Sequence, residues 1–397
     1  MNRNRGYSLI ELMVAVTLGL VLLAGIVQVF VNSKQGYQVQ QSTGRAQENT
    51  RFAVEYLNRY ITLADFWSTL KPSVNTGSIT FNTAPTGSGA CKVASWIVDP
   101  ATGIKGYDGK SASSGFADTT LGSCVGSLSN SAGSEAYVPN SDVLVIRYVN
   151  PDCYLPTTSG GSSSSGGSSG GSSGSSSSGS GIATISAPPA APAACSTASG
   201  IYWLRTQIGV NGVLFNINSA TDVTAAKNSI GGGGDAPNGV LNYQYQANIF
   251  FLANVDNGQG QTPTLYMATL QNPAGTAQTS VQLYLQPLID GVEMLKFEYG
   301  IDPTYGQAND NLSISQYLPA GSVTNWAQVL SVRASMIVRG DTLDNFQDSQ
   351  SYQMTNAFNY AATAGSSSGS TSYAGSEKYQ RRLIVKEFLL RNKVRGP

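Results

Sequence analysis

The sequence lacks histidine altogether, and only 12% of its 397 residues are charged. Histidine is the usual general base, the partner of serine and cysteine nucleophiles, and the commonest metal ligand. No convergent Ser-Lys or carboxylate motif stands in for it. We therefore expect a protein that is not an enzyme and that has no catalytic residues.

An excess of charge of one sign is also missing, because 23 basic residues balance 23 acidic ones. Proteins that bind nucleic acid normally carry a basic patch or stripe. The composition therefore predicts no direct nucleic-acid partner.

What the chain does have is a long apolar run, Tyr7 to Val31. A helix rises about 1.5 Å per residue, so this run can cross a hydrocarbon core of about 30 Å. Arg3 and Arg5 precede it and should keep the short leader on the cytoplasmic side, with the remainder exported. An ordinary secretory signal is the competing interpretation. The run is longer than such a signal's apolar core and contains a carboxylate, Glu11.

The helical pattern continues beyond the apolar run, from residue 37 to residue 66. Apolar residues recur there at spacings of three and four, and charges of alternating sign lie opposite them. The apolar stripe is Ala53, Leu57, Tyr60, Ile61 and Ala64, and the charged face is Arg51, Glu55 and Arg59. We expect one helix of about 50 to 60 residues, with a transmembrane and assembly half at 7–31 and an amphipathic half at 32–67.

The remaining residues, 68–397, predict a β-rich head. Residues 329–339 alternate between apolar and polar side chains, which is typical of a half-buried strand, and 295–301 do the same. Further strands are expected at 200–208, 211–217, 241–254, 263–270, 280–289 and 381–391. No second long helix is expected. The fold class is α+β, a long N-terminal helix packed on an antiparallel sheet. We interpret Tyr202, Trp203, Phe250 and Phe251 as core.

Two low-complexity features lie within the head. Residues 159–181 contain only Ser and Gly and predict a flexible linker between strands or lobes. Four cysteines, Cys91, Cys124, Cys153 and Cys195, are too far apart for a CxxC zinc or redox motif. An even number in an exported chain favours two disulfides, with three possible pairings. We prefer Cys91 with Cys124 and Cys153 with Cys195 because these loops are topologically simplest; four buried thiols are the alternative.

The N-terminal stretch "RGYSLIELMVAVTLGLVLLAGIVQVF" resembles the class III signal and N-terminal helix of type IV pilins and pseudopilins. The resemblance implies that a prepilin peptidase cuts after Gly6 and that the new amino terminus, Tyr7, is methylated. The family usually has Phe at that position, so Tyr7 is a mild departure. The family's glutamate falls on Glu11, which would pair with the amino terminus of a neighbouring subunit and set the register of assembly.

Later stretches resemble the PilW family of minor pilins. The matching segments are "NSK" (32–34), "QENTRFA" (47–53), "SDVLVIRYV" (141–149), "DGVEMLKFEYGID" (290–302), "VLSVRASMIVR" (329–339) and "LLRN" (389–392). PilW-like sequences often carry a calcium-like loop after the last "YGID" strand. The candidate ligands here are Asp302, Asn309, Asp310 and Asn311, but their spacing departs from a calcium loop. We therefore expect no cofactor, with calcium as the alternative.

By this resemblance the chain is a structural minor pilin that primes type IV pilus assembly and joins the tip complex. Expected partners are other minor pilins, the major pilin, the inner-membrane assembly platform, the prepilin peptidase and a large tip adhesin. The head would lie in the periplasm of a Gram-negative bacterium before assembly and at the cell surface afterwards. The alternatives are a J-type minor pseudopilin of a type II secretion system and a pilin-like surface adhesin.

Overall fold

The computed structural model describes residues 8–68, 70, 79–81, 98–111, 115–116, 118–126, 135–155, 202–207, 211–217, 219–233, 239–256, 261–271, 282–308, 310–340, 347–361 and 378–394. Several predicted features lie outside these residues. They are the leader, Gly6, Tyr7, Cys91, Cys195, Asn309 and the Ser/Gly tract 159–181.

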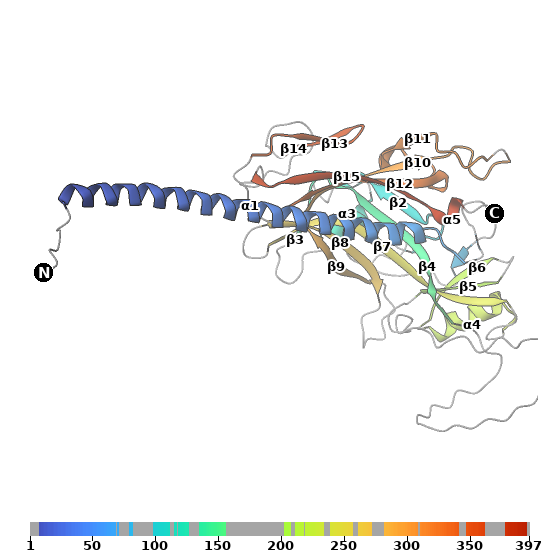
Figure 1. The fold of residues 1–397 in the computed structure, drawn as a ribbon. Coiled ribbons are helices and arrows are strands. Elements are labelled where there is room, and N and C mark those ends of the chain that lie inside the picture. Colours follow the sequence, from blue (N-terminus) through green and yellow to red (C-terminus); the bar gives the residue numbers. More distant parts are fainter. Residues whose placement is uncertain are drawn as a thin grey trace, which may run out of the picture.

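A single helix, α1, spans Leu9–Leu63 and comprises 55 residues, as the sequence predicts. Its first half projects away from the head and its second half lies against the sheets (Figure 1). The predicted stripe is confirmed, since Ala53, Leu57 and Ile61 are fully buried, and the opposite charged face is exposed. The helix ends four residues before the predicted boundary at 67. Asp65 has a φ of 61°, which is incompatible with continued α-helix.

The larger sheet has nine strands and is organised around β7, Val240–Asp256. One edge of β7 pairs with β5 and then with β8, and its other edge pairs with β4 and then with β3. The other members are β1 (Ile79–Phe81), β2 (Ile104–Tyr107), β3 (Glu135–Tyr137), β4 (Val143–Leu155), β5 (Tyr202–Gln207), β6 (Gly212–Asn216), β8 (Gln261–Gln271) and β9 (Gln282–Asp290). All described pairings are antiparallel except β1 with β6.

A second sheet has the order β11-β10-β12-β15. Its strands are β10 (Val292–Ile301), β11 (Gln316–Leu318), β12 (Val329–Arg339) and β15 (Arg381–Leu389), and a hairpin of β13 (Ser351–Thr355) and β14 (Phe358–Ala361) packs on it. The short helices are α3 (Thr119–Gly126), α4 (Ala220–Ser229), α5 (Arg391–Val394), η4 (Ala320–Ser322) and η5 (Trp326–Gln328). The α+β prediction is confirmed.

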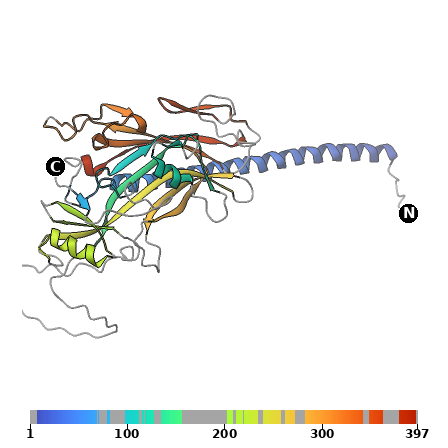
Figure 2. The ribbon, with the colours of Figure 1, turned by 180° about the vertical axis from the view of Figure 1, so that it is seen from behind.

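The main core lies where the second half of α1 meets both sheets. Leu57 and Ile61 of the helix share one cluster with Phe250 of the large sheet and Phe297 of the four-stranded sheet. The opposite face of the large sheet is covered by α3 (Figure 2). The four aromatics interpreted as core, Tyr202, Trp203, Phe250 and Phe251, are each at most 3% exposed.

The strand at 329–339 forms as predicted, but it is not half-buried. Its polar residues Ser331, Ser335 and Arg339 are also buried, and β10 is buried along its whole length. The reason is that the second face of this sheet is covered in part by the β13–β14 hairpin. Arg339 faces Glu293 of β10 at 3.7 Å, so the buried charge has an opposite charge beside it.

Candidate assembly surface

The projecting half of α1 exposes apolar side chains on all sides. Leu9, Leu22 and Phe30 are each more than two-thirds exposed, and no residue from Ser8 to Gln41 is buried. By length and composition, α1 is the one helix among the described residues that can cross a membrane. An apolar surface of this extent is stable only in lipid or against other apolar surfaces. This half of the helix is therefore a membrane anchor or a packing surface.

The helix enters the head at a close contact between small residues. Ser42 lies directly against Gly340, just after β12, and a Cβ atom on Gly340 would lie 1.9 Å from Ser42 Oγ. Beside this contact, Thr43 Oγ1 donates to Gln380 Oε1 at 2.9 Å. About two turns further on, Asn49 Nδ2 donates to the Asp290 carbonyl at 3.0 Å. These contacts fix the point at which the projecting half begins.

The far end of α1 is held by the C-terminus of the chain. Asn392 Nδ2 donates to the carbonyls of Thr62 (3.1 Å) and Ala64 (3.0 Å), which the helix leaves without helical partners. The ammonium of Lys393 lies 3.8 Å from Asp65. Burial lowers the pKa of Lys393, and Asp65 opposes that effect. The second half of α1 is thus anchored at both ends.

Glu11 lies near the start of α1 and is exposed. Its Oε2 accepts a hydrogen bond from the backbone N–H of Ser8, the N-cap residue, at 3.0 Å. A carboxylate in the first turn also interacts favourably with the helix dipole. In this chain Glu11 therefore caps its own helix. The predicted pairing with the amino terminus of Tyr7 on a neighbouring subunit stays a prediction.

The joint between the two sheets is formed by Asp142, immediately before β4. Its carboxylate accepts the backbone N–H groups of Gly109 and Phe297, both at 2.7 Å, and forms an ion pair with Lys296 of β10. The backbone N–H of Asp142 also donates to the Leu295 carbonyl at 2.8 Å. Burial raises the pKa of Asp142 to about 6, and Lys296 opposes that increase.

A second buried charge cluster fixes the β13–β14 hairpin on the four-stranded sheet. Glu293 is fully buried and accepts hydrogen bonds from Arg381 Nε (2.5 Å), Arg381 Nη2 (3.0 Å) and the Tyr360 hydroxyl (2.9 Å). Arg381 Nη1 lies 3.3 Å from Asp348. The bidentate geometry is the strong form of the Arg–carboxylate pair.

The predicted calcium candidates lie in the loop after β10. Asp302 accepts the Thr304 N–H (2.9 Å), the Thr304 hydroxyl (2.6 Å) and the Ser313 N–H (3.1 Å). Asp310 accepts the N–H groups of Gly306 (2.9 Å) and Leu312 (2.8 Å), and the Gly306 bond is the main cause of its lowered pKa. Asn311 is exposed. These carboxylates organise the loop itself, and the structure brings together no group of three or more acidic, Cys or His side chains anywhere in its described part.

Cys124 in α3 is disulfide-bonded. Its preferred partner, Cys91, lies outside the described residues, and so does Cys195, the preferred partner of Cys153. The pairing therefore stays a prediction.

Sequence reasoning missed the roles of Asn49, Asn392, Asp142 and Glu293. Each lies inside a stretch that carries the resemblance, which was the available signal, but each has a partner more than 60 residues away in sequence. The structure shows that these stretches contact one another. Asn49 in "QENTRFA" binds Asp290 in "DGVEMLKFEYGID", and Asn392 in "LLRN" binds the end of α1.

Two family models match the chain. Residues 1–27 match the prokaryotic N-terminal methylation motif, and residues 249–392 match the family of the type IV pilus-assembly protein W, PilW. The comparisons with curated proteins and with solved structures each gave no match. The methylation motif covers the start of the projecting helix, and the PilW match covers most of the surface on which its second half rests. Both matches agree with the sequence resemblance, which is confirmed over these residues: the chain is similar to type IV pilus-associated pilins of the PilW family.

Proposed function

We propose that the chain is a structural, non-catalytic minor pilin that primes assembly of a type IV pilus and is built into its tip complex. The observation that carries this proposal is the shape of α1. One half is anchored in the head at Ser42 and at Asn392, and the other half presents an apolar surface that no described part of the head covers. When such a helix moves from lipid into a bundle of similar helices, it carries the rigidly attached head with it.

Before assembly, the projecting half lies in the inner membrane of a Gram-negative cell and the head lies in the periplasm. After extraction, neighbouring pilin helices replace the lipid around the same side chains. The partners are other minor pilins, the major pilin, the assembly platform and a large tip adhesin. The PilW match supports a pilus subunit over a J-type pseudopilin of a secretion system.

Glu11 has a task in each step. In the uncut chain, its carboxylate caps α1 through the Ser8 N–H. Cleavage after Gly6 by the prepilin peptidase creates an α-amino group at Tyr7, which would then be methylated. Once the helix has left the headgroup region, a buried carboxylate needs an opposite charge. The amino terminus of an adjacent subunit supplies that charge, so only one axial register satisfies both groups.

Two substitutions at Glu11 separate capping from charge pairing. Glu11→Gln keeps an oxygen that accepts the Ser8 N–H but removes the charge, whereas Glu11→Ala removes both. We expect both variants to be cleaved after Gly6 and both to be depleted in sheared pili, measured by quantitative immunoblotting against the membrane pool. Normal incorporation of the Gln variant would show that the cap, and not the charge, is what matters.

A bulky residue at Gly6 provides the processing control. That variant should remain uncut in the membrane fraction, as N-terminal sequencing would show. Its head should stay folded, because no described residue before Ser42 is buried.

A further inference from the structure

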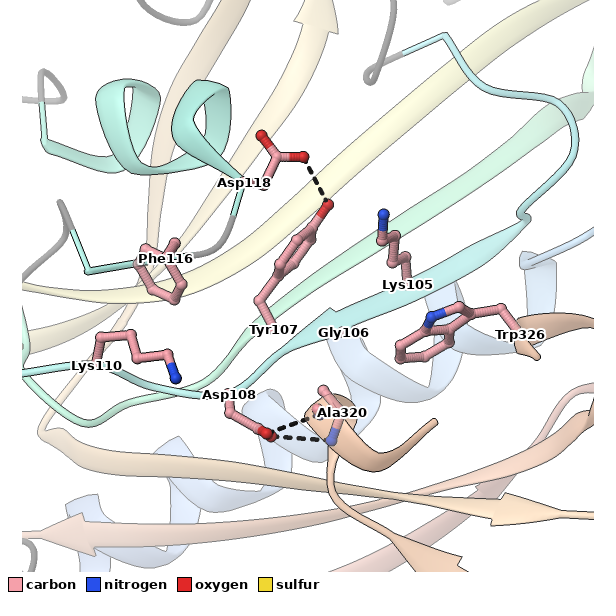
Figure 3. Close-up of a pocket in the computed structure, with 10 residues that line it drawn as sticks. Lys105, Gly106, Tyr107, Asp108, Lys110, Phe116, Asp118, Ala320 and Trp326 are labelled. Atoms are coloured by element: carbon pink, nitrogen blue, oxygen red, sulfur yellow. Dashed lines mark hydrogen bonds between the residues drawn. The ribbon is translucent and has the colours of Figure 1, made fainter. Parts of the chain in front are cut away.

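The described sheets end in strands whose outer edges are mostly protected. Strand β2 is covered by η4, and Asp108 fixes that contact by accepting the backbone N–H groups of Ala320 and Gly321 (Figure 3). Strand β9 contains Pro287 and pairs with an irregular register, and β1, β3 and β11 have three residues each. Cover, proline, irregular register and short length are the usual means of keeping a sheet edge from pairing with another chain.

Strand β15 has none of these protections. Its nine residues, Arg381–Leu389, include no proline and pair with β12 without a break in register. In the described chain no strand pairs with its other edge. An unbroken edge of this length can accept a further strand.

Hydrogen bonds at the two ends of β15 show which of its residues face the free edge. The Leu390 N–H donates to the Leu330 carbonyl at 2.8 Å, and the Gly340 N–H donates to the Gln380 carbonyl at 2.9 Å. Because bonded residues alternate in an antiparallel pair, the even-numbered residues of β15 bond to β12 and the odd-numbered ones face away. The outward backbone groups are those of Arg381, Leu383, Val385, Glu387 and Leu389.

The second half of this edge is open to solvent. Val385, Lys386 and Glu387 are consecutive, and all three are exposed. Since successive side chains of a strand point to opposite faces of the sheet, exposure of all three requires that the edge beside them is uncovered. The edge of β2 differs, because Ile104 and Gly106 are buried there.

The two faces beside the open edge differ in chemistry. On the outer face, Val385 and Leu389 are 51% and 52% exposed, because the β13–β14 hairpin packs elsewhere on the sheet. On the face towards α1, Phe388 joins the core, whereas Arg382 and Lys386 are exposed. Neither cation forms an ion pair in the described part of the chain. An added strand therefore meets apolar side chains on one face and positive charge on the other.

The only carboxylate of β15 does not neutralise these cations. Glu387 accepts a hydrogen bond from the Tyr317 hydroxyl. Its side chain lies on the outer face, opposite to that of Lys386. Charge complementarity thus favours acidic residues in the added strand on the α1 face alone.

The position of β15 indicates which molecule supplies that strand. It runs beside the second half of α1 and begins where the projecting half leaves the head, next to the hydrogen bond between Thr43 and Gln380 (Figure 1). A subunit whose helix packs on the projecting half therefore lies next to this edge.

We propose that the open edge of β15 accepts an extended segment of a neighbouring pilus subunit as an added strand. The segment alternates apolar and acidic residues. Its apolar side chains pack on Val385 and Leu389, and its carboxylates pair with Lys386 and Arg382. The proposal rests on the assembly role given above and adds to it a specific contact between heads.

The test uses the full chain in detergent, which covers the projecting helix, and a capped, fluorescein-labelled heptapeptide of alternating Val and Glu that begins with Val. Fluorescence anisotropy should show saturable binding. Methylation of the valine amide nitrogens blocks the peptide edge that faces β15 and should weaken binding at least about tenfold. Methylation of the glutamate amide nitrogens blocks only the other edge, so that peptide should bind like the unmodified one.

Two variants of the chain locate the binding site. Val385→Pro removes an outward N–H but no bond to β12, so it should weaken binding while circular dichroism stays unchanged. Lys386→Glu should also weaken binding, whereas Arg51→Glu, the same charge change on the exposed face of α1, should not. The two methylated peptides are compared on the unaltered chain, so that comparison holds even if a variant misfolds.

Equal binding of the two methylated peptides would overturn the proposal, and so would a lack of saturable binding. A dimer of the unaltered chain in analytical ultracentrifugation that Val385→Pro abolishes would also overturn it, since that result assigns the edge to a second copy. The Glu11 experiment reads incorporation into pili, so failure here and failure of the assembly role give different results.

Discussion

Asp142 illustrates how a single buried carboxylate can join two sheets that are far apart in sequence. Its two oxygens bind groups from the β2 side and from β10, 155 residues further along the chain. Burying a carboxylate costs free energy, and the fold tolerates it here only because the hydrogen bonds and the ion pair of Asp142 are all formed. The side chain is 2% exposed, so water cannot replace a lost partner.

The raised pKa of Asp142 has a consequence for stability against pH. Its native pKa of about 6 exceeds the ordinary aspartate pKa of 3.8, so between these pH values the folded chain binds more protons than the unfolded chain. The contribution of this group to the free energy of unfolding therefore increases as pH falls from 7 to 4, by up to about 1.4 kcal/mol per unit.

Asp142→Asn removes that dependence and tests it. We expect the variant to be less stable than the unaltered chain, and the difference to grow between pH 7 and pH 5. Urea unfolding of both proteins in detergent at several pH values measures it. If the difference shrinks as pH falls, Lys296 outweighs burial and the pKa of Asp142 is lowered instead.

At the scale of elements, the contact between α1 and β12 depends on the absence of a side chain at Gly340. Ser42 Oγ is buried and makes no hydrogen bond in the described structure, so its hydroxyl contributes little to stability. What matters is that the helix can approach the sheet closely. The position of the projecting half relative to the head is set here.

Gly340→Ala should therefore destabilise the head, by about 1 to 3 kcal/mol, because the added methyl group occupies the site of Ser42 Oγ. Ser42→Ala alone should be close to neutral. The two changes together should restore most of the stability, since the remaining Cβ–Cβ approach is 3.2 Å. Additive losses in thermal unfolding would contradict the contact as described.

The elements differ in how far the sequence predicted them. The stripe of α1 and the alternation of 329–339 are local patterns, and both elements form where expected. Burial of the polar face of β12 was not predictable, because it depends on a hairpin and on ion pairs with residues elsewhere in the chain. The end of α1 was missed for the same reason: Asn392 caps it from 328 residues away. Glu11 could be singled out from the sequence because its motif is contiguous, but its pairing across subunits stays a prediction.

At the scale of the molecule, the head and the projecting half of α1 are separable. The first buried residue of the described helix is Ser42, and residues 8–38 are all exposed. A fragment starting at Gln35 keeps every described contact of the head and loses the apolar surface that needs lipid.

We expect that fragment to be soluble without detergent and to unfold in one cooperative transition by circular dichroism. A fragment starting at Asn49 removes Ser42 and Thr43 and should be less stable, which makes it the matched control. Aggregation of the longer fragment would show that the projecting half supports the head.

The anchoring of α1 also imposes an order on biogenesis. The groups that receive its two ends, Gln380 and Asn392, lie 337 and 330 residues after their partners, so they leave the ribosome last. Throughout export the first half of α1 can already be in the bilayer, while the stripe from Ala53 to Ile61 has no sheet to cover it. Closing loops of this length is slow, and uncovered apolar surface aggregates. The membrane tether thus brings a second benefit: it keeps each unfinished head apart from others until the last strand arrives.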